Sequence, residues 1–193
     1  GPFARQPHWR GLGGEVDGTA REYMLVEERD LLPVPDAWSF AEAATMPCAA
    51  VTAWHALVSV GGVKPGDTVL TLGSGGVSVF ALQIAALRGA RVIATSSDDA
   101  KLARLKALGA ADGVNYRATP HWDRAVRSLT GGRGVDMVVE VGGGGTFDRS
   151  VRAARDGGQV LRVGDLSGAV DPSRIVVERG VRVTPIVVGS RQM

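Results

Sequence analysis

Short apolar runs alternate with longer segments of helical periodicity along most of the chain. The apolar runs are rich in β-branched residues and lack polar alternation, which is typical of strands buried on both faces. The predicted strands are residues 68–72, 91–95, 113–116, 134–141, 157–163 and 181–188. The segments between them repeat apolar residues at the period of a helix, and several end at glycines. The predicted helices are residues 77–89, 96–109, 120–132, 144–154 and 171–179.

This alternation decides the fold class. Strands that alternate with helices of this length predict a parallel sheet with helices on both faces. Right-handed crossovers make it a doubly wound, six-stranded α/β sheet of the Rossmann type, with strand order 3-2-1-4-5-6. Ligands bind such sheets at the carboxyl ends of the strands, near the point where the two halves of the sheet diverge.

The N-terminal part of the chain has a different pattern. Residues 1–20 lack apolar periodicity and predict a loop, whereas residues 22–28 (EYMLVEE) predict a short strand. Two prolines within residues 31–38 predict an extended connector.

A helix is expected to follow this connector. Ser39 and Glu42 have the spacing of a capping box, which marks a helix N-terminus. Pro47 lies inside the helical pattern, so the helix should break or restart there, with the proline in its first turn. The pattern ends at Gly61 and Gly62.

Composition excludes several classes of protein. A net charge of +2 without a basic block argues against a nucleic-acid partner, and the 27 glycines occupy turn positions rather than a repeat. The single cysteine, Cys48, excludes a disulfide framework and suits a reducing compartment. No apolar run has the length of a membrane span. We therefore expect a soluble, cytoplasmic protein.

Three glycines between the first strand of the regular part and its helix suggest a phosphate-binding turn. Gly73 permits a tight turn, and Gly75 and Gly76 let the backbone approach a pyrophosphate at the helix N-terminus, which begins near Val77. Ser78 replaces the third glycine of the dinucleotide fingerprint, but it is small enough for close packing of helix on strand. The alternative is an ordinary tight turn, and the series of strands and helices favours the dinucleotide interpretation.

The second strand lacks the acidic residue that often binds the adenosine ribose. It ends in Thr95 and Ser96, which are neutral. Hydroxyl groups and nearby cations suit the 2′-phosphate of NADP, whereas a carboxylate would repel it. The side chains expected at that phosphate are Ser96, Ser97, Lys101, Tyr116 and Arg117. The alternative is that Asp98 or Asp99 supplies a displaced acid and favours NAD, although both suit the N-terminus of the next helix.

Several longer stretches resemble one enzyme superfamily. They are LPVPDAWSFAEAATMPCAAVTAWHAL, KPGDTVLTLGSGGVSVFALQIA, GARVIATSSDDAKLARLKALGA, VNYR and GRGVDMVVEVGG. From about Leu12 onward the chain resembles the medium-chain dehydrogenase/reductase superfamily, in its quinone oxidoreductase-like branch, often labelled zinc-type alcohol dehydrogenase.

The resemblance implies roles for individual residues. Lys101 and Tyr116 match positions that bind the 2′-phosphate in NADP-using members, and Thr52 matches a threonine near the nicotinamide-side phosphate and ribose. The loops around the nicotinamide are matched by Val141, Gly142, Gly164, Leu166, Val188, Gly189 and Ser190. The strand at residues 181–188 resembles the edge strand through which members form homodimers.

The resemblance also implies a domain organisation. Members have an N-terminal GroES-like catalytic domain, and residues 1–38 match only its C-terminal remnant and linker. Residues 39–193 match the NAD(P)-binding Rossmann domain. We therefore expect the cofactor domain of a larger enzyme or a truncated product of one.

Zinc is not expected to bind to this chain. Cys48 lies where zinc-dependent relatives have a ligand, but a catalytic zinc site needs three protein ligands. The histidines His8, His55 and His121 lack a suitable spacing, and no C-x-x-C pair occurs. Cys48 is therefore interpreted as a small buried residue, and Trp122 as a packing residue.

These observations predict an NADP(H)-dependent oxidoreductase. Hydride would pass between the nicotinamide and a carbonyl, quinone, enone or alcohol carbon of a small molecule, and no side chain is assigned as a catalytic acid. The alternatives are a dinucleotide-binding module without turnover, a fragment of an NAD-dependent zinc-type alcohol dehydrogenase, and a structural or interaction domain with a vestigial fold.

Overall fold

The structure, a computed structural model, describes residues 11–13, 16–171 and 178–189. The chain forms two compact units, Gly1–Ala43 and Ala44–Met193, which are described separately. The boundary predicted at residues 38 and 39 by the domain resemblance stays a prediction.

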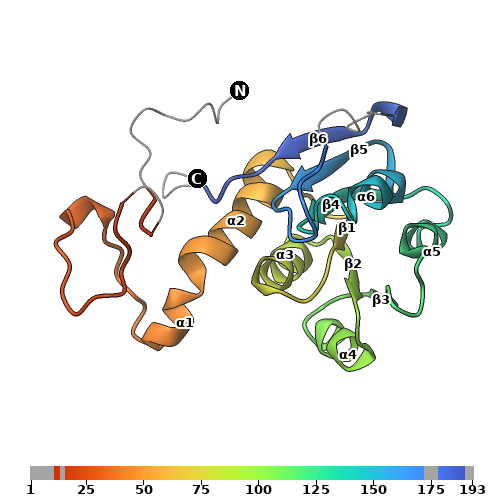
Figure 1. The fold of residues 1–193 in the computed structure, drawn as a ribbon. Coiled ribbons are helices and arrows are strands. Elements are labelled where there is room, and N and C mark those ends of the chain that lie inside the picture. The colour runs from red at the N-terminus through yellow and green to blue at the C-terminus, as the bar shows by residue number, and fades with distance from the viewer. Residues whose placement is uncertain (1–10, 14–15, 172–177, 190–193) are drawn as a thin grey trace. The chain divides into compact units, whose positions relative to one another are not determined.

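The second unit is built on one parallel sheet of six strands (Figure 1). Its strand order is β3-β2-β1-β4-β5-β6, which confirms the predicted doubly wound order. The strands are β1 (Thr68–Thr71), β2 (Arg91–Ser96), β3 (Asp112–Asn115), β4 (Val135–Glu140), β5 (Ala154–Arg162) and β6 (Arg182–Pro185). The carboxyl ends of these parallel strands therefore lie at one edge of the sheet.

Helices cover both faces of this sheet. The α-helices of this unit are α2 (Val51–Trp54), α3 (Gly76–Leu87), α4 (Asp99–Ala107), α5 (Trp122–Leu129) and α6 (Phe147–Ala153). Another α-helix, α1 (Phe40–Ala44), belongs mostly to the first unit. Buried residues of α2, α3 and α4 pack with Val69 and Val92 into one core cluster. Those of α5 and α6 pack with Leu70 and Ile93 into another. Adjacent strand residues thus point to opposite faces, as the apolar runs predicted.

Local signals account for the helix ends. Asp98 caps α4, because its Oδ1 accepts a hydrogen bond from Lys101 N at 3.0 Å. Gly89 and Gly109 follow α3 and α4 with φ values of +76° and +113°, a region that glycine adopts without strain. In the first unit, Glu42 Oε2 accepts from Ser39 N at 2.8 Å, which confirms the predicted capping box.

The predicted strand at residues 22–28 is wrong. No strand occurs among the described residues of the first unit, and Glu28–Asp30 forms a 3₁₀ turn instead. Tyr23 and Leu25 are 90% and 98% exposed. A strand exists only where a neighbour completes its hydrogen-bond ladder, and no such neighbour lies beside this segment among the described residues of its unit.

The helical stretch around Pro47 is less regular than a single α-helix. Two π-helical segments, η2 (Met46–Ala50) and η3 (His55–Val60), flank α2, and Pro47 lies in the first turn of η2, as predicted. Phe40–Val60 is long and apolar enough to cross a membrane by length and composition alone. A core helix of a soluble protein meets the same criterion, and Ala53, Ala56 and Leu57 are indeed fully buried in the core.

The C-terminal part differs in two details from the prediction. The helix predicted at 171–179 falls mostly outside the described residues, and Glu178–Gly180 forms a 3₁₀ turn, η5. The sixth strand was predicted to continue to residue 188, but β6 ends at Pro185.

A buried carboxylate joins three strands near their amino ends. Asp136 in β4 accepts hydrogen bonds from Thr68 N in β1 at 2.8 Å, from Arg155 Nε in β5 at 2.6 Å and from Arg133 Nη2 at 2.6 Å. Burial alone would raise the pKa of Asp136, but these three donors outweigh that effect and lower its pKa.

Candidate dinucleotide site

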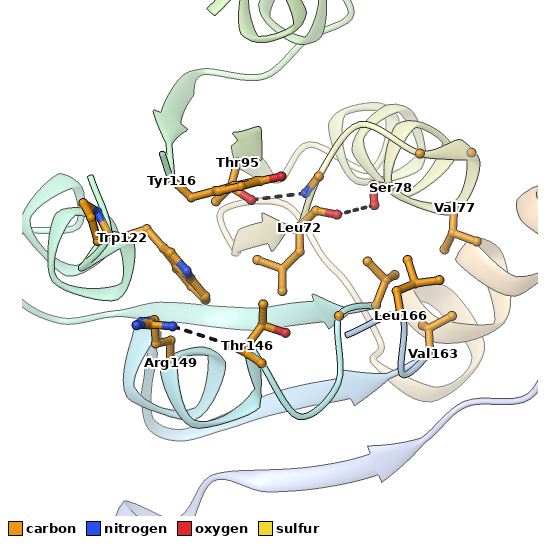
Figure 2. Close-up of a pocket in the computed structure, with 18 residues that line it drawn as sticks. Leu72, Val77, Ser78, Thr95, Tyr116, Trp122, Thr146, Arg149, Val163 and Leu166 are labelled. Atoms are coloured by element: carbon orange, nitrogen blue, oxygen red, sulfur yellow. Dashed lines mark hydrogen bonds between the residues drawn. The ribbon is translucent and has the colours of Figure 1, made fainter. Parts of the chain in front are cut away.

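A hollow of about 640 Å³ lies at the carboxyl ends of the strands in the second unit (Figure 2). It extends from the loop after β3 to the loops after β4 and β5, with the turn after β1 between them. Its lining consists of Leu72, Gly73, Gly75, Gly76, Val77, Ser78, Thr95, Tyr116, Pro120, Trp122, Val141, Gly142, Gly145, Thr146, Arg149, Val163, Gly164 and Leu166. This is the place at which doubly wound sheets bind ligands.

The glycine turn after β1 is fixed to its neighbours by two hydroxyl groups. Gly73 has a φ of +76°, and its N–H donates to Thr95 Oγ1 of β2 at 3.1 Å. Ser78 is buried, and its Oγ donates to Leu72 O at 2.6 Å. The replacement of the third fingerprint glycine by serine therefore keeps α3 close to β1 and adds a hydrogen bond.

The N-terminus of α3 offers free backbone donors to the hollow. Its N-cap residue is Gly75, which has no side chain to accept hydrogen bonds from the first turn. An added Cβ at Gly75 would meet no atom within 4 Å, so the space above this backbone is open. Free N–H groups and the positive end of a helix dipole form an anion-binding site.

The loop after β4 owes its shape to Glu140, which is completely buried. Its Oε1 accepts hydrogen bonds from Gly142 N at 2.6 Å, Gly143 N at 3.0 Å and Thr146 Oγ1 at 2.6 Å. Its Oε2 accepts another from Ser150 Oγ. One carboxylate thus connects the loop that lines the hollow to α6.

The loops after β4 and β5 also bind each other through their backbones. Gly144 N donates to Gly168 O at 2.7 Å, and Ser167 N donates to Gly142 O at 2.6 Å. There is no room for side chains here, since a Cβ at Gly144 would lie 2.8 Å from Ala169 O. Three of the four glycines at 142–145 are explained by the close approach of the two loops, whereas a Cβ at Gly142 would overlap Thr146 of the same loop.

The other end of the hollow combines flat side chains with one cation. Tyr116 and Trp122 line this end, and Arg149 of α6 lies beside Trp122 (Figure 2). Pro120, two residues before Trp122 in the chain, also belongs to the lining. Among the described residues that line the hollow, Arg149 is the one with a charged side chain. Trp122 packs in the core, as predicted, and also lines the hollow.

The structure brings together more than half of the residues assigned to the cofactor. The assigned residues that line the hollow are Gly73, Gly75, Gly76, Val77, Tyr116, Val141, Gly142, Gly164 and Leu166. Those that do not line it are Thr52, Ser96, Ser97, Lys101, Val188 and Gly189. Ser190 lies outside the described residues.

The residues outside the lining have other contacts. Thr52 is buried in α2, and its Oγ1 donates to Cys48 O at 2.5 Å. Ser96 is buried at the end of β2, where its carbonyl oxygen accepts from Tyr116 N at 3.0 Å. Lys101 is exposed on α4, so its long side chain is free to move toward a ligand.

Other lining residues were not assigned to the cofactor from the sequence. They are Leu72, Ser78, Thr95, Pro120, Trp122, Gly145, Thr146, Arg149 and Val163. Thr95 and Val163 lie at or just beyond strand ends, so the strand boundaries alone could have suggested them, whereas Thr146 is the N-cap residue of α6. Arg149 gave no such signal, because a single arginine in a predicted helix is most often a solvated surface charge.

Within the described part of the chain, no three His, Cys, Asp or Glu side chains form a group that could hold a metal ion. Cys48 is exposed, so its interpretation as a buried residue is wrong. In its segment, Met46–Ala50, only Ala50 is buried, and Cys48 lies on the outer side. His8 lies outside the described residues. These residues do not fit a zinc site, and the expectation that no zinc binds stays a prediction.

A parallel sheet of this order, flanked by helices and with a hollow at its switch point, defines a Rossmann-type α/β fold. Residues 76–193 match the family model described as zinc-binding dehydrogenase. The chain belongs to this family, within the medium-chain dehydrogenase/reductase superfamily. The predicted superfamily is thus confirmed.

Known proteins of this family are similar over most of the chain. A zinc-type alcohol dehydrogenase-like protein of Schizosaccharomyces pombe is 40% identical over 94% of this chain and 55% of its own length. The crystal structure of an NAD-dependent alcohol dehydrogenase is 40% identical, with a TM-score of 0.87 over 96% of this chain and 55% of that one.

Two further solved structures are similar to this chain. A quinone oxidoreductase of Pseudomonas syringae is 30% identical, with a TM-score of 0.76 over 81% of this chain and 49% of that one. A mycobacterial protein solved in complex with NADPH is 37% identical, with a TM-score of 0.74 over 80% and 49%. The chain therefore spans about half the length of the relatives that it matches.

Proposed function

We propose that the protein is the cofactor-binding part of an NADP(H)-dependent oxidoreductase that acts on a carbonyl, quinone, enone or alcohol. The observation that carries the proposal is the hollow in which the free N–H groups of α3 face the loops after β4 and β5. When bound, the nicotinamide supplies the hydride chemistry, and the protein supplies position and electrostatics.

The residues that line the hollow suit a dinucleotide bound in one orientation along it. The N–H groups at the start of α3 would bind the pyrophosphate, and Gly75 leaves room for it. Val141, Gly142, Val163, Gly164 and Leu166 would enclose the nicotinamide end and exclude water from one of its faces. The adenosine would then lie toward Tyr116 and Trp122.

The preference for NADP rests on the end of β2. Thr95 and Ser96 carry no charge there, and the alternative acids are engaged elsewhere. Asp98 caps α4, and Asp99 Oδ1 accepts a hydrogen bond from Asn115 Nδ2 at 2.9 Å. Neither carboxylate lines the hollow, and neither does Lys101, but the Lys101 side chain is exposed and long enough to extend toward a ligand. A phosphate on the ribose would therefore meet hydroxyl groups and Lys101 rather than a repelling acid.

Parallel titrations with NADPH and NADH test this preference. We expect NADPH to bind roughly tenfold more tightly, which is about 1.4 kcal/mol, as measured by calorimetry. Lys101→Ala should reduce the affinity for NADPH more than that for NADH. Lys106→Ala is a matched control, because Lys106 is also exposed on α4. Tighter binding of NADH would indicate that Asp98 or Asp99 binds the ribose, and binding of neither would indicate a vestigial site.

A second candidate is a dinucleotide-binding module without turnover. It is favoured by the length of the chain, which covers 55% of its S. pombe relative. A hollow that holds only the cofactor would leave the substrate unpositioned, which weakens catalysis by proximity. Steady-state turnover of NADPH by this chain, absent in Lys101→Ala, would exclude this candidate. An NAD-dependent fragment of a zinc-type alcohol dehydrogenase is a third, and the NADH titration addresses it.

We also propose a soluble cytoplasmic homodimer that pairs through the outer edge of β6. Because Ile186 N donates to Arg162 O of β5, the backbone N–H of Val183 faces the outer edge. Position 185 faces the same edge but is a proline, so it offers no donor. Val183→Pro should convert the dimer to a monomer in sedimentation without removing a bond to β5. A wild-type monomer would contradict the proposal.

A further inference from the structure

A second hollow in the second unit is lined by residues of α5, α6 and η5 (Figure 1). Its volume is about 630 Å³. That is within the range of small-molecule sites, about 300–1,000 Å³. The residues that line it are His121, Asp123, Arg124, Arg127, Arg152 and Arg179. None of them lines the hollow at the carboxyl ends of the strands, so the two hollows are separate places on the protein.

The described lining of this second hollow has an excess of positive charge. Four arginines surround one carboxylate, that of Asp123, which leaves an excess of three positive charges. Asp156 also pairs with Arg179 Nη1 at 3.1 Å, but its side chain is 77% exposed, so water screens most of that attraction. Cations gathered around one hollow repel one another, and an anion bound among them would relieve that repulsion.

Two of these arginines are held by backbone carbonyl groups. Arg127 Nη1 donates to Ala154 O at 3.1 Å, and its Nη2 donates to Gly132 O at 2.5 Å. Arg179 Nη2 donates to Val151 O at 2.8 Å. A carbonyl oxygen satisfies a donor and fixes the side chain, but it carries no charge that could neutralise the guanidinium. The positive charge of both arginines is therefore in position before any ligand binds, which reduces the entropy that binding costs.

The other two arginines have donors that the protein does not use. Arg152 Nε donates to Asp123 Oδ2 at 2.8 Å, and its two terminal nitrogens have no partner among the described residues. Arg124 is exposed, and its guanidinium has no partner in the described part of the chain. The exposed His121 precedes Arg124 by three residues and lines the same hollow. The group that this lining lacks is an acceptor with negative charge.

The donors and the charge define the class of ligand. A guanidinium group only donates hydrogen bonds, and its planar fork matches the oxygens of a phosphate group. A phosphate monoester carries about −1.5 to −2 charges at pH 7, so two phosphate groups would compensate an excess of three. The described lining contains no aliphatic or aromatic side chain other than the imidazole of His121. It therefore favours a compact, highly charged anion over a ligand with an apolar part.

We propose that this hollow is a second binding site, for a small anion that carries two phosphate groups, such as pyrophosphate or a sugar bisphosphate. Arg127 and Arg179 supply fixed positive charge, and Arg124 and Arg152 donate to the phosphate oxygens. Because the two hollows share no lining residue, the anion should bind while NADPH is bound. The inference goes beyond the proposed function and does not depend on it.

Calorimetric titration with pyrophosphate in the presence of saturating NADPH tests the proposal. NADPH would occupy the free N–H groups at the start of α3, which could otherwise bind phosphate as well. We expect one pyrophosphate to bind per chain, and orthophosphate to bind more weakly. If NADPH does not bind, the proposed function fails, but the same titration of variants without NADPH still identifies the site of the anion.

Arg124→Gln is the informative variant, because Arg124 has no partner to lose and the melting temperature should not fall. Its affinity for pyrophosphate should be lower by about tenfold or more, and tenfold is equivalent to about 1.4 kcal/mol. Arg104→Gln is the matched control, because Arg104 is an exposed arginine of α4 that lies outside the lining. Its affinity for pyrophosphate should equal that of the wild type.

Titration with a hexose 1,6-bisphosphate distinguishes the sources of the phosphate groups. Tighter binding of the bisphosphate would support an organic ligand of this site, and tighter binding of pyrophosphate would support an inorganic one. Failure of the wild-type chain to bind either anion would overturn the proposal. Equal affinities of the wild type and Arg124→Gln, an equal loss in Arg104→Gln, or displacement of pyrophosphate by NADPH would overturn it too, because each would place the anion elsewhere.

Discussion

At the scale of single residues, glycines of this site differ in what an added methyl group would meet. Gly75 has φ −79° and ψ 172°, an extended conformation open to any residue, and its Cβ would meet nothing within 4 Å. Gly143 has a φ of +80°, and its Cβ would lie 2.6 Å from Asp165 Cα. One position therefore keeps space for a ligand, and the other is filled by the protein.

Alanine at these two positions should separate binding from folding. Gly75→Ala should leave the free energy of unfolding within about 0.5 kcal/mol of wild type. It should reduce NADPH affinity at least tenfold, because the methyl group stands where the pyrophosphate approaches. Gly143→Ala should lower the unfolding free energy by about 3 kcal/mol through strain and overlap. Urea denaturation and calorimetry measure both effects, and a destabilised Gly75→Ala that still binds NADPH would contradict the assignment.

Glu140 is expected to act as a positioning residue. Glu140→Gln replaces one carboxylate oxygen by an NH₂ group, which donates hydrogen bonds instead of accepting them. The N–H and O–H groups around it also donate, so we expect the free energy of unfolding to fall by about 1–3 kcal/mol. The loop at 142–145 should then loosen and weaken NADPH binding more than 5′-AMP binding, since it lines the nicotinamide end. Glu22→Gln, in an exposed position of the first unit, is the control. Equal weakening of both ligands would show that the loop is not the element affected.

At the scale of elements, a segment was predicted correctly where its own residues determine its secondary structure. It was predicted wrongly where the structure depends on contacts with another part of the chain. The strands of the sheet were located within a few residues, because burial on both faces leaves an uninterrupted apolar run. The segment at 22–28 contains a shorter apolar run, Tyr23–Val26, but a strand also needs a neighbour that its own sequence does not reveal. Helix ends marked by Asp98, Gly89 and Gly109 were predicted for the same local reasons that the structure displays.

The sequence predicted the part of the candidate site that is formed by backbone groups. The glycines at the turn after β1 predict a phosphate-binding turn, because they lie between a predicted strand and a predicted helix. Side chains that reach the hollow from a helix, such as Arg149, depend on its rotation about its axis. The residues that hold the loops from behind, Glu140 above all, depend on contacts that form only after folding.

The hydrogen bonds of Asp136 to groups of β1 and β5 should make the stability of the protein decrease at low pH. Its pKa is lowered in the folded protein, so its contribution to stability is present above the unfolded value near 3.9 and is lost as pH falls below it. Asp136→Asn should cost roughly 3 kcal/mol at pH 7, because Arg133 and Arg155 lose their shared partner. Urea midpoints measured from pH 7 to pH 3 should converge for the two proteins. A difference that stays constant over this range would contradict the role of ionised Asp136.

At the scale of the whole molecule, nucleotide binding should be linked to the unfolding of the second unit alone. All residues of the hollow belong to Ala44–Met193. NADPH at 100 times its dissociation constant should stabilise that unit by about 2.7 kcal/mol. Thermal denaturation with and without NADPH measures the shift, and in Gly75→Ala, at the same NADPH concentration, a tenfold lower affinity should reduce the stabilisation to about 1.4 kcal/mol or less. A shift of similar size in that variant would mean that NADPH binds elsewhere.

The interlocked loops after β4 and β5 have a consequence for synthesis on the ribosome. The turn at Gly73 and its partner Thr95 leave the ribosome early, and they can meet as soon as β1 and β2 pair. The loop at 142–145 must wait for Ser167 and Gly168, whose backbone groups complete its hydrogen bonds. A nascent chain can therefore form the hydrogen bond between Gly73 and Thr95 before the hydrogen bonds of the loop at 142–145 are complete.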